Sequence, residues 1–521
     1  MQLSTAASTC AARLATASLA LALTLVALAA SPVSAASDLY VAPAPAGSDS
    51  SDCLSPATPC ATVGGALVKA AGADTIHVAA GAYSEQVVID KAVTILGPNA
   101  GVDPNTATRG AEAVFSGAGP IFTLQNGTLG VSGVTIDGLA FANVTGTAYN
   151  GVITVPGYGA GNVTIADNTF TDVTAEAVGY HGNMGLVAPL GTNWTVEANR
   201  VERVTGLNRS GLWFGNLTGS VIRDNVVIDP ARSGILVSGG TDVSVTGNQV
   251  LNAVFGLNIG TDAASSPITN VALESNTVLD STFAGIVINS PTLAPGVTIL
   301  FNRLTGNATG IYSNATTTVV AENQWWGCNA GPGAPGCDTL TGTIDADPWL
   351  TLTLTADPAS VLTGGTAALH AALTANSAGA TPSGGSIMDG TSIAFSVDTG
   401  TLSAPSAGTV DGVASVTLTA GTTRGTATAQ AVLDHQTVSA AIVVTAPAPN
   451  ATPTPTPSAT LSPAPNATPT PTPSARAVPE TSTADHGLDG RGGPDSAALF
   501  LAALALLGGV ALWAARRRLA R

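Results

Sequence analysis

The chain has 521 residues, enough for two or three domains, and only 10% of them are charged. Its formal net charge is −16, and it contains only two lysines, Lys69 and Lys91. We therefore expect no nucleic-acid partner, because there is no basic stripe to neutralise phosphates.

The first segment has the pattern of a secretory signal peptide. Arg13 precedes an apolar run from Leu14 to Ala30, and Val33-Ser34-Ala35 offers a small-x-small cleavage site. Residues 1–35 are therefore predicted to direct export and to be removed. The rest of the chain is then expected to fold where disulfides persist.

Four cysteines remain after this segment, in two local pairs. Cys53 is close to Cys60, and Cys328 is close to Cys337. Zinc is the alternative to disulfides, but neither pair is a CxxC and no His lies near either pair. We expect two disulfides, no metal site and no cofactor.

A short motif of alternating apolar residues that ends in Asn recurs between residues 163 and 323, at intervals of 21 to 31 residues. The Asn positions are Asn168, Asn199, Asn225, Asn248, Asn276, Asn302 and Asn323. A further copy, Val134 to Gly138, carries Gly instead of Asn, and a second strand that opens with Gly follows most copies. Two short strands in such a period have the length of one coil of a solenoid.

The repeated Asn has a physical role in a solenoid. Equivalent residues of adjacent coils stack about 4.8 Å apart, so each Asn amide can bond to the Asn above and below it. Asn also tolerates the left-handed backbone of a bend. We expect these seven residues to form a structural Asn ladder.

With these repeats, residues 38–350 resemble the right-handed parallel β-helix proteins of the pectate-lyase-like fold. The segment after Cys60 resembles an N-terminal cap with an amphipathic helix. The segment from Asn323 to Leu350 looks like a closing turn, whose Trp325, Trp326 and Trp349 plug the apolar end. An antiparallel sandwich is the alternative, but it needs hairpin turns between neighbouring strands.

The rest of the chain predicts a stalk and an anchor. Residues 351–446 resemble a bacterial immunoglobulin-like β-sandwich of the invasin and intimin type, which usually acts as a spacer. Residues 447–495 form a Pro/Thr-rich extended stalk. Residues 497–515 are long enough for one transmembrane helix, and residues 516–521 form a basic cytoplasmic tail. The predicted fold class is thus all-β, with a single membrane helix.

A wall-sorting signal is an alternative to this anchor. The segment Val478 to Ser482 is similar to an LPxTG motif, but Val replaces Leu and Ser replaces Gly. A membrane anchor is therefore the preferred prediction.

Recognisable catalytic residues are scarce. In the polysaccharide hydrolases of the fold that this chain resembles, Asp residues from adjacent coils act as general acid and base. The most similar pattern here is formed by Asp137, Asp167 and Asp224, each of which comes just before a ladder position. Stacked carboxylates would shift each other's pKa values, yet Ala198 interrupts the line. No catalytic residue is assigned.

Loop length suggests a binding site. In three consecutive coils the segment between the ladder residue and the Gly-led strand is longer than elsewhere, and insertions on one side of a solenoid often build a binding face. The candidate ligand-binding residues are Tyr180, His181, Arg203, Arg209 and Trp213. The alternative is a polar loop whose charges are satisfied by ion pairs with neighbours such as Glu202.

These features favour a protein exported to the outer face of the cell membrane or wall, with a β-helix for binding or adhesion. A polysaccharide or cell-surface glycan is the expected partner, and catalysis is not expected. The first alternative is a polysaccharide lyase or glycoside hydrolase. The second is a structural component of the envelope.

Overall fold

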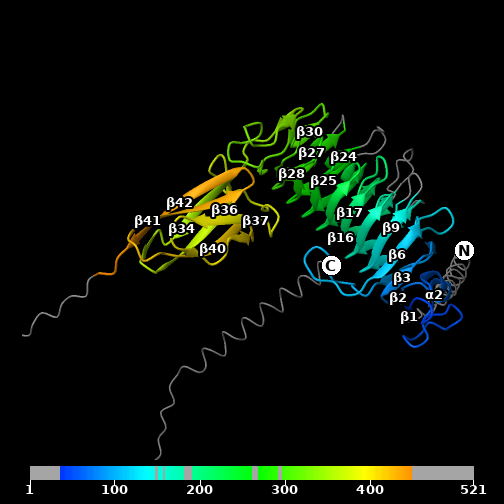
Figure 1. The fold of residues 1–521 in the computed structure, drawn as a ribbon. Coiled ribbons are helices and arrows are strands. Elements are labelled where there is room, and N and C mark those ends of the chain that lie inside the picture. Colours follow the sequence, from blue (N-terminus) through cyan, green and yellow to red (C-terminus); the bar gives the residue numbers. More distant parts are fainter. Residues whose placement is uncertain are drawn as a thin grey trace, which may run out of the picture. The chain divides into compact units, whose positions relative to one another are not determined.

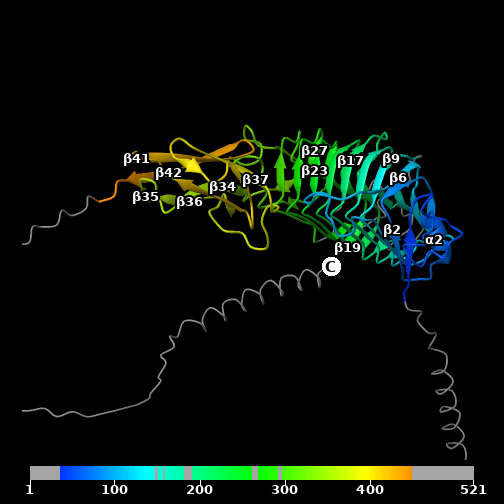
Figure 2. The same ribbon diagram turned by 60° about the horizontal axis from the view of Figure 1, so that its bottom comes forward.

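The computed structural model describes residues 36–146, 151–156, 159–180, 191–260, 268–290 and 296–448 (Figures 1 and 2). The predicted signal peptide, membrane span and tail, and all of the predicted stalk beyond residue 448, lie outside these ranges. Within them, no helix is long and apolar enough to cross a membrane.

Three parallel sheets form the solenoid (Figure 1). Sheet A contains β1 (Asp38–Val41), β2 (Asp74–Val78), β5 (Val93–Leu96), β8 (Thr135–Asp137), β11 (Ala160–Gly161), β12 (Thr164–Ala166), β15 (Gly191–Thr192), β16 (Thr195–Glu197), β19 (Leu217–Arg223), β22 (Gly240–Thr246), β25 (Ile268–Glu274) and β28 (Thr298–Leu300). Sheet B contains β3 (Gly81–Tyr83), β6 (Ala113–Ala118), β9 (Ala140–Thr145), β13 (Thr169–Val173), β17 (Arg200–Val204), β20 (Val226–Pro230), β23 (Gln249–Leu251), β26 (Thr277–Leu279) and β29 (Arg303–Thr305). Sheet C contains β4 (Val87–Ile89), β7 (Phe122–Leu124), β10 (Ile153–Val155), β14 (Val178–Tyr180), β18 (Leu212–Phe214), β21 (Ser233–Val237), β24 (Phe255–Gly260), β27 (Ala284–Asn289), β30 (Ile311–Ser313) and β32 (Leu340–Thr341). A short pair, β31 (Val319–Val320) and β33 (Ile344–Asp345), closes the series.

The coils differ from the expected two strands per period, because a third strand follows each ladder position directly. In one coil β12 ends at Ala166 and β13 begins at Thr169, so only Asp167 and Asn168 separate the two strands. The strands of sheet B were missed because the two-residue bend interrupts the alternation so briefly.

Inward side chains stack in columns along the solenoid axis. In sheet B the rings of Tyr83, Phe115, Phe141 and Phe170 stack with successive centroids 4.9, 5.7 and 4.8 Å apart. The column continues through Val201, Val227, Val250, Val278 and Leu304. Each of these side chains is buried by the coils above and below it, so no coil is stable without its neighbours.

A column of buried amides follows the bend between sheets A and B. Asn248 Oδ1 accepts hydrogen bonds from the backbone N–H and the Nδ2 of Asn225 at 3.1 and 2.9 Å, and Asn248 Nδ2 donates to Ile222 O at 2.9 Å. The same pattern links Asn168, Asn199, Asn225, Asn248, Asn276 and Asn302, all fully buried. These six residues form the predicted Asn ladder.

The predicted ladder was wrong by one residue at its C-terminal end, and the further copy ending at Gly138 was also aligned one residue too early. Gln324, not Asn323, is the last rung, and its Oε1 accepts from the N–H and Nδ2 of Asn302 at 2.9 and 3.0 Å. Asn323 occupies the preceding bend position, with a φ of 56°. At the other end Leu139, not Gly138, fills the rung position, and its N–H donates to Asn168 Oδ1 at 3.0 Å. Gly138 and Asn323 occupy the bend but resemble ladder residues in the sequence. Alignment of the repeated motif therefore placed the ladder position one residue too early in these two coils.

Gly recurs near the start of the sheet C strands because valine side chains of sheet B leave no space for a Cβ there. A Cβ on Gly234 would lie 2.3 Å from Val250 Cγ1, and a Cβ on Gly256 would lie 2.2 Å from Val278 Cγ1. Only a residue without a side chain lets the backbone pass this corner. The recurring Gly therefore fixes the tight turn from sheet B into sheet C.

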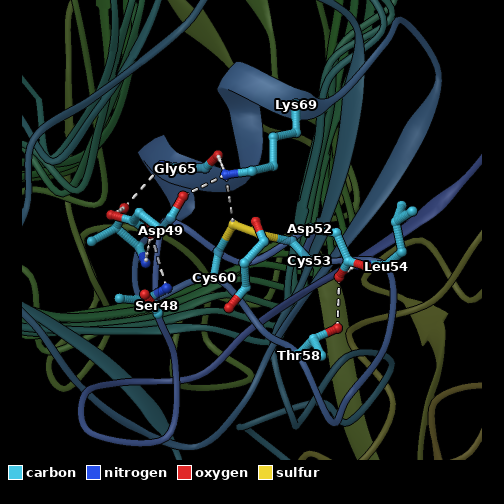
Figure 3. Close-up of a disulfide and its surroundings, with 12 residues drawn as sticks. Ser48, Asp49, Asp52, Cys53, Leu54, Thr58, Cys60, Gly65 and Lys69 are labelled. Atoms are coloured by element: carbon cyan, nitrogen blue, oxygen red, sulfur yellow. Dashed lines mark hydrogen bonds between the residues drawn. A yellow bond between two sulfur atoms is a disulfide. The ribbon is translucent and has the colours of Figure 1, made fainter.

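The N-terminal cap contains the one helix in the described part of the chain, α2 (Val63–Lys69). The Thr62 hydroxyl accepts from Gly65 N–H at 2.8 Å and caps the helix. The Cys53–Cys60 disulfide lies beside it, and Lys69 Nζ donates to Asp49 O at 2.8 Å and to Gly65 O at 3.3 Å (Figure 3). The second predicted disulfide, Cys328–Cys337, is also formed.

A shorter polar ladder ends at a buried carboxyl group near the C-terminal end of the solenoid. Asn307 Oδ1 accepts from Ser281 N–H at 2.9 Å, and Asn307 Nδ2 donates to Asp338 Oδ2 at 2.7 Å. Asp338 is 5% exposed. Burial raises its pKa to about 6, although the hydrogen bonds from Asn307 oppose the shift.

Asp338→Asn is expected to stabilise the protein at neutral pH and to have little effect below pH 4. A folded-state pKa above the ordinary 3.8 means that this carboxyl group favours folding while protonated, and that this contribution is lost as the pH rises to about 6. The shift of about two pKa units corresponds to at most about 3 kcal/mol. Melting temperatures of both proteins from pH 4 to pH 7 test this, and a pH-independent difference would contradict it.

After the solenoid, two antiparallel sheets enclose a second apolar core. One contains β34 (Leu350–Asp357), β36 (Thr366–Asn376), β38 (Thr401–Leu402) and β40 (Val413–Thr419). The other contains β35 (Ser360–Leu362), β37 (Ser392–Val397), β39 (Ser406–Gly408), β41 (Gly425–Leu433) and β42 (Gln436–Thr445), with β35 parallel to β42. This is the expected β-sandwich architecture, while a relationship to bacterial immunoglobulin-like domains stays a prediction.

The sandwich packs on the last coil of the solenoid. Phe301 and Trp325 belong to the apolar core of the sandwich, whereas Trp326 belongs to the core of the solenoid. Asp434, in the turn between β41 and β42, forms a two-point ion pair with Arg303 and accepts from Trp325 Nε1 at 2.6 Å. The predicted closing turn is therefore completed by the sandwich.

Candidate functional site

Of the predicted binding residues, Tyr180 and Trp213 lie on β14 and β18, which are neighbours in sheet C, whereas Arg203 lies on β17 in sheet B. Trp213 is partly exposed and lies between the buried Leu212 and Phe214, so its indole points outward. Its Nε1 donates to Ser238 Oγ at 2.7 Å in the next coil. Tyr180 ends β14. His181 lies outside the described residues.

Both predicted arginines pair with carboxylates of the preceding coil. Arg203 binds Asp172 through Nε and Nη2 at 2.6 and 3.0 Å, and it also contacts Glu202 at 3.1 Å. This hydrogen bonding lowers the pKa of Asp172. Arg209 Nη1 lies 3.4 Å from Glu176 Oε1. The contacts of both arginines therefore agree with the alternative of a polar loop with satisfied ion pairs.

Glu176 is the most unusual acid in this region. Its side chain is 1% exposed, and Oε2 has no hydrogen-bond partner. Burial raises its pKa, while backbone hydrogen bonds and the nearby Arg209 act in the opposite direction. Burial therefore favours the protonated form of this carboxyl group more than it would in an exposed glutamate.

The long segment after Asn168 differs from its predicted position. The sheet C strand of the coil after Asn168 is Val178–Tyr180, not the Gly-led segment at Gly185, which lies outside the described residues. In that coil the additional residues follow the strand instead of preceding it. The three long segments therefore do not all precede the sheet C strand of their coil in the sequence.

The three Asp residues do not form a stack. Asp137 pairs in register with Ala166, whereas Asp167 and Asp224 occupy bends with φ of 53° and 57°. The loop between β5 and β6 also covers this region, since Gly101 N–H donates to Asp137 Oδ1 at 3.1 Å and Asn105 Nδ2 donates to Asp224 O at 3.3 Å. This arrangement gives no pair of carboxylates facing a common ligand.

A metal site is also not evident in the described ranges. They contain no group of three or more His, Cys, Asp or Glu residues that could hold an ion.

Residues 124–270 and 157–325 match the family model described as "Right handed beta helix region". The solenoid is a right-handed parallel β-helix. This confirms the predicted fold of the solenoid, and the matched residues span most of the ladder. No curated protein matches the chain.

Several solved structures are similar to this β-helix at low identity. A rhamnogalacturonan lyase is 14% identical, with a TM-score of 0.36 over 55% of this chain and 75% of that one. The A-module of a mannuronan C-5 epimerase from Azotobacter vinelandii is 15% identical, with a TM-score of 0.34 over 48% and 73%. A tailspike protein of an Acinetobacter baumannii bacteriophage, titled a capsular polysaccharide depolymerase, is 12% identical, with a TM-score of 0.30 over 73% and 74%. At these scores no activity can be transferred to this chain.

A second group of side chains, in or just before strands of sheet C nearer the C-terminal end, was not predicted from the sequence. Phe255, Phe283 and Tyr312 lie on three successive coils, and Arg232 lies on the coil before them. One signal was available, because each of these aromatic residues lies within two positions of the Gly that opens its strand.

Proposed function

We propose that this protein is exported and held at the cell surface, where the outer face of its β-helix binds carbohydrate without cleaving it. The terminal segments favour export and anchoring. The β-helix supplies a long, rigid and charge-poor surface, on which a linear polymer can contact several coils.

The observation that carries this proposal is the outward indole of Trp213. An aromatic ring beside polar groups suits a sugar, which offers an apolar ring face and a rim of hydroxyl groups. Tyr180, His181, Arg203 and Arg209 are proposed to line the same site. The hydrogen bond from Trp213 to Ser238 fixes the indole in place, so little conformational entropy is lost on binding.

Binding without turnover is favoured by the state of the nearby carboxylates. Asp172, Glu202 and Glu176 each pair with an arginine, and Asp137 is out of register with the bend residues Asp167 and Asp224. Glycoside hydrolysis needs two carboxyl groups that flank one bond, whereas the first three of these carboxylates are held by arginines and the other three do not stack.

The test is to incubate the full chain with acidic and neutral polysaccharides, with and without Ca²⁺, and to measure both binding and polymer length. We expect binding without shortening of the polymer. Trp213→Ala and Tyr180→Ala should weaken binding at least about tenfold, whereas Tyr40→Ala, at the N-terminal end of the solenoid, should not.

Each other outcome has a defined meaning. Absence of binding to every polysaccharide would overturn the proposed function. Binding that is untouched by Trp213→Ala and Tyr180→Ala would overturn the proposed site. Cleavage of any polymer would overturn binding without turnover.

A polysaccharide-cleaving enzyme is the second candidate, and Glu176 is the observation that favours it. Its buried carboxyl group, with a raised pKa and an unpaired oxygen, has the properties of a general acid. If cleavage occurs, Glu176→Gln should abolish it and leave binding intact. Retention of cleavage in this variant would exclude Glu176 from the chemistry.

A further inference from the structure

Four side chains form a strip across four consecutive coils: Phe255 and Tyr312 lie on sheet C, and Arg232 and Phe283 lie just before its strands β21 and β27. Phe283 lies between Phe255 and Tyr312, with ring centroids 5.2 Å from each, at interplanar angles of 81° and 62°. The guanidinium carbon of Arg232 lies 5.8 Å from the centroid of Phe255. We call these four residues the aromatic strip.

The strip is not part of the apolar core. The core columns are complete without it, and Phe283 remains 43% exposed. In the described part of the chain it is the only aromatic residue among the large hydrophobic side chains that are exposed. Phe255 and Tyr312 are half-buried beside it, and an aromatic cluster that reaches the surface often marks an interaction site.

Arg232 differs from the other described arginines of the solenoid, because no carboxylate pairs with it. The other six each form an ion pair: Arg109, Arg200, Arg203, Arg209, Arg223 and Arg303. The chain has a formal charge of −16, so an arginine without an acidic partner is unexpected here. Arg232 instead contacts the face of Phe255.

We propose that the aromatic strip binds an anionic glycan, with sugar rings packed on Phe283 and Tyr312 and an acidic group paired with Arg232. This inference rests on the proposed function and names the class of glycan. A guanidinium binds carboxylate or sulfate with two parallel hydrogen bonds. The Tyr312 hydroxyl can both donate to and accept from sugar hydroxyls.

The width of the strip favours a glycan over a protein partner. Four side chains in a single row cannot supply the roughly 800 Å² that each partner buries in a stable protein interface. A linear polysaccharide needs only a narrow contact, which is repeated along its length. Successive coils, about 4.8 Å apart, present the rings in such a row.

The experiment compares acidic polysaccharides with neutral counterparts of the same backbone. The full chain is titrated with hyaluronan and alginate, each in its native and its carboxyl-reduced form. Phe283→Ala and Arg232→Gln test the strip. Val68→Ala on α2 and Arg424→Gln on the sandwich are controls, because both native residues are also exposed.

We expect at least one native acid polymer to bind more tightly than its reduced form. Phe283→Ala should weaken binding at least tenfold to both forms. Arg232→Gln should remove the preference for the acid form, and neither control should change binding. Equal melting temperatures would show that the folds are intact.

Three results would contradict the inference in distinguishable ways. Binding unchanged in both strip variants but lost in Trp213→Ala would overturn the strip and leave the proposed function standing. Equal affinity of the wild type for acidic and reduced polymers would overturn the anionic class. Absence of binding to any polysaccharide would overturn the proposed function and this inference together.

Discussion

Asn248→Ala is expected to lower the free energy of unfolding by at least about 3 kcal/mol. The substitution removes the acceptor for the N–H and Nδ2 of Asn225, and it removes the donor to Ile222 O and Asn276 Oδ1. All of these groups are buried inside the ladder. Each unsatisfied buried group costs about 1–3 kcal/mol.

Denaturant unfolding of the wild type and the variant measures this difference. Gln249→Ala is the matched control, because Gln249 is the next residue, lies on β23 and points outward. The control should change stability by less than about 0.5 kcal/mol. Equal effects of the two substitutions would mean that the ladder contributes nothing beyond an ordinary surface amide.

Asp434→Ala is expected to cost about 3–5 kcal/mol, because it leaves a partly buried cation without its partner. Asp434 is 6% exposed and Arg303 is 18% exposed, and Trp325 Nε1 would also lose its acceptor. The loss should appear as a lower melting temperature and as separate unfolding of the solenoid and the sandwich.

Asp411→Ala separates this effect from backbone strain. Asp411 and Asp434 both have a left-handed backbone, with φ of 50° and 52°, so Ala introduces the same strain at each. Asp411 is exposed and forms no ion pair. If Asp411→Ala destabilised the protein as much as Asp434→Ala, the ion pair with Arg303 would be irrelevant to stability.

The solenoid could be predicted from the sequence because its physics repeats in every coil. The inward valines and the buried Asn must recur at each turn, so the repeat itself reveals the fold and most of the ladder. The strands of sheet B escaped prediction because a bend of only two residues, such as Asp167 and Asn168, barely interrupts the alternation. The ladder positions of Leu139 and Gln324 were not predicted, because the preceding residues, Gly138 and Asn323, resemble ladder residues in the repeated motif.

The candidate site was less predictable because it does not repeat. Sequence identified Arg203 and Arg209 as unusual, but only the structure shows Asp172 and Glu176 beside them. These partners come from the preceding coil, about thirty residues away, and no local pattern links them. For the same reason, nothing in the sequence distinguishes Arg232, which has no acidic partner, from its neighbours.

The packing of the sandwich on the last coil has a consequence for self-association. A parallel β-helix that ends abruptly presents unpaired backbone groups and an apolar cross-section, which can template the stacking of another copy. Here Phe301 and Trp325 are enclosed by the sandwich, and Asn323 accepts a hydrogen bond from Asn376. The domain expected to act as a spacer therefore also protects the solenoid against end-to-end polymerisation into filaments.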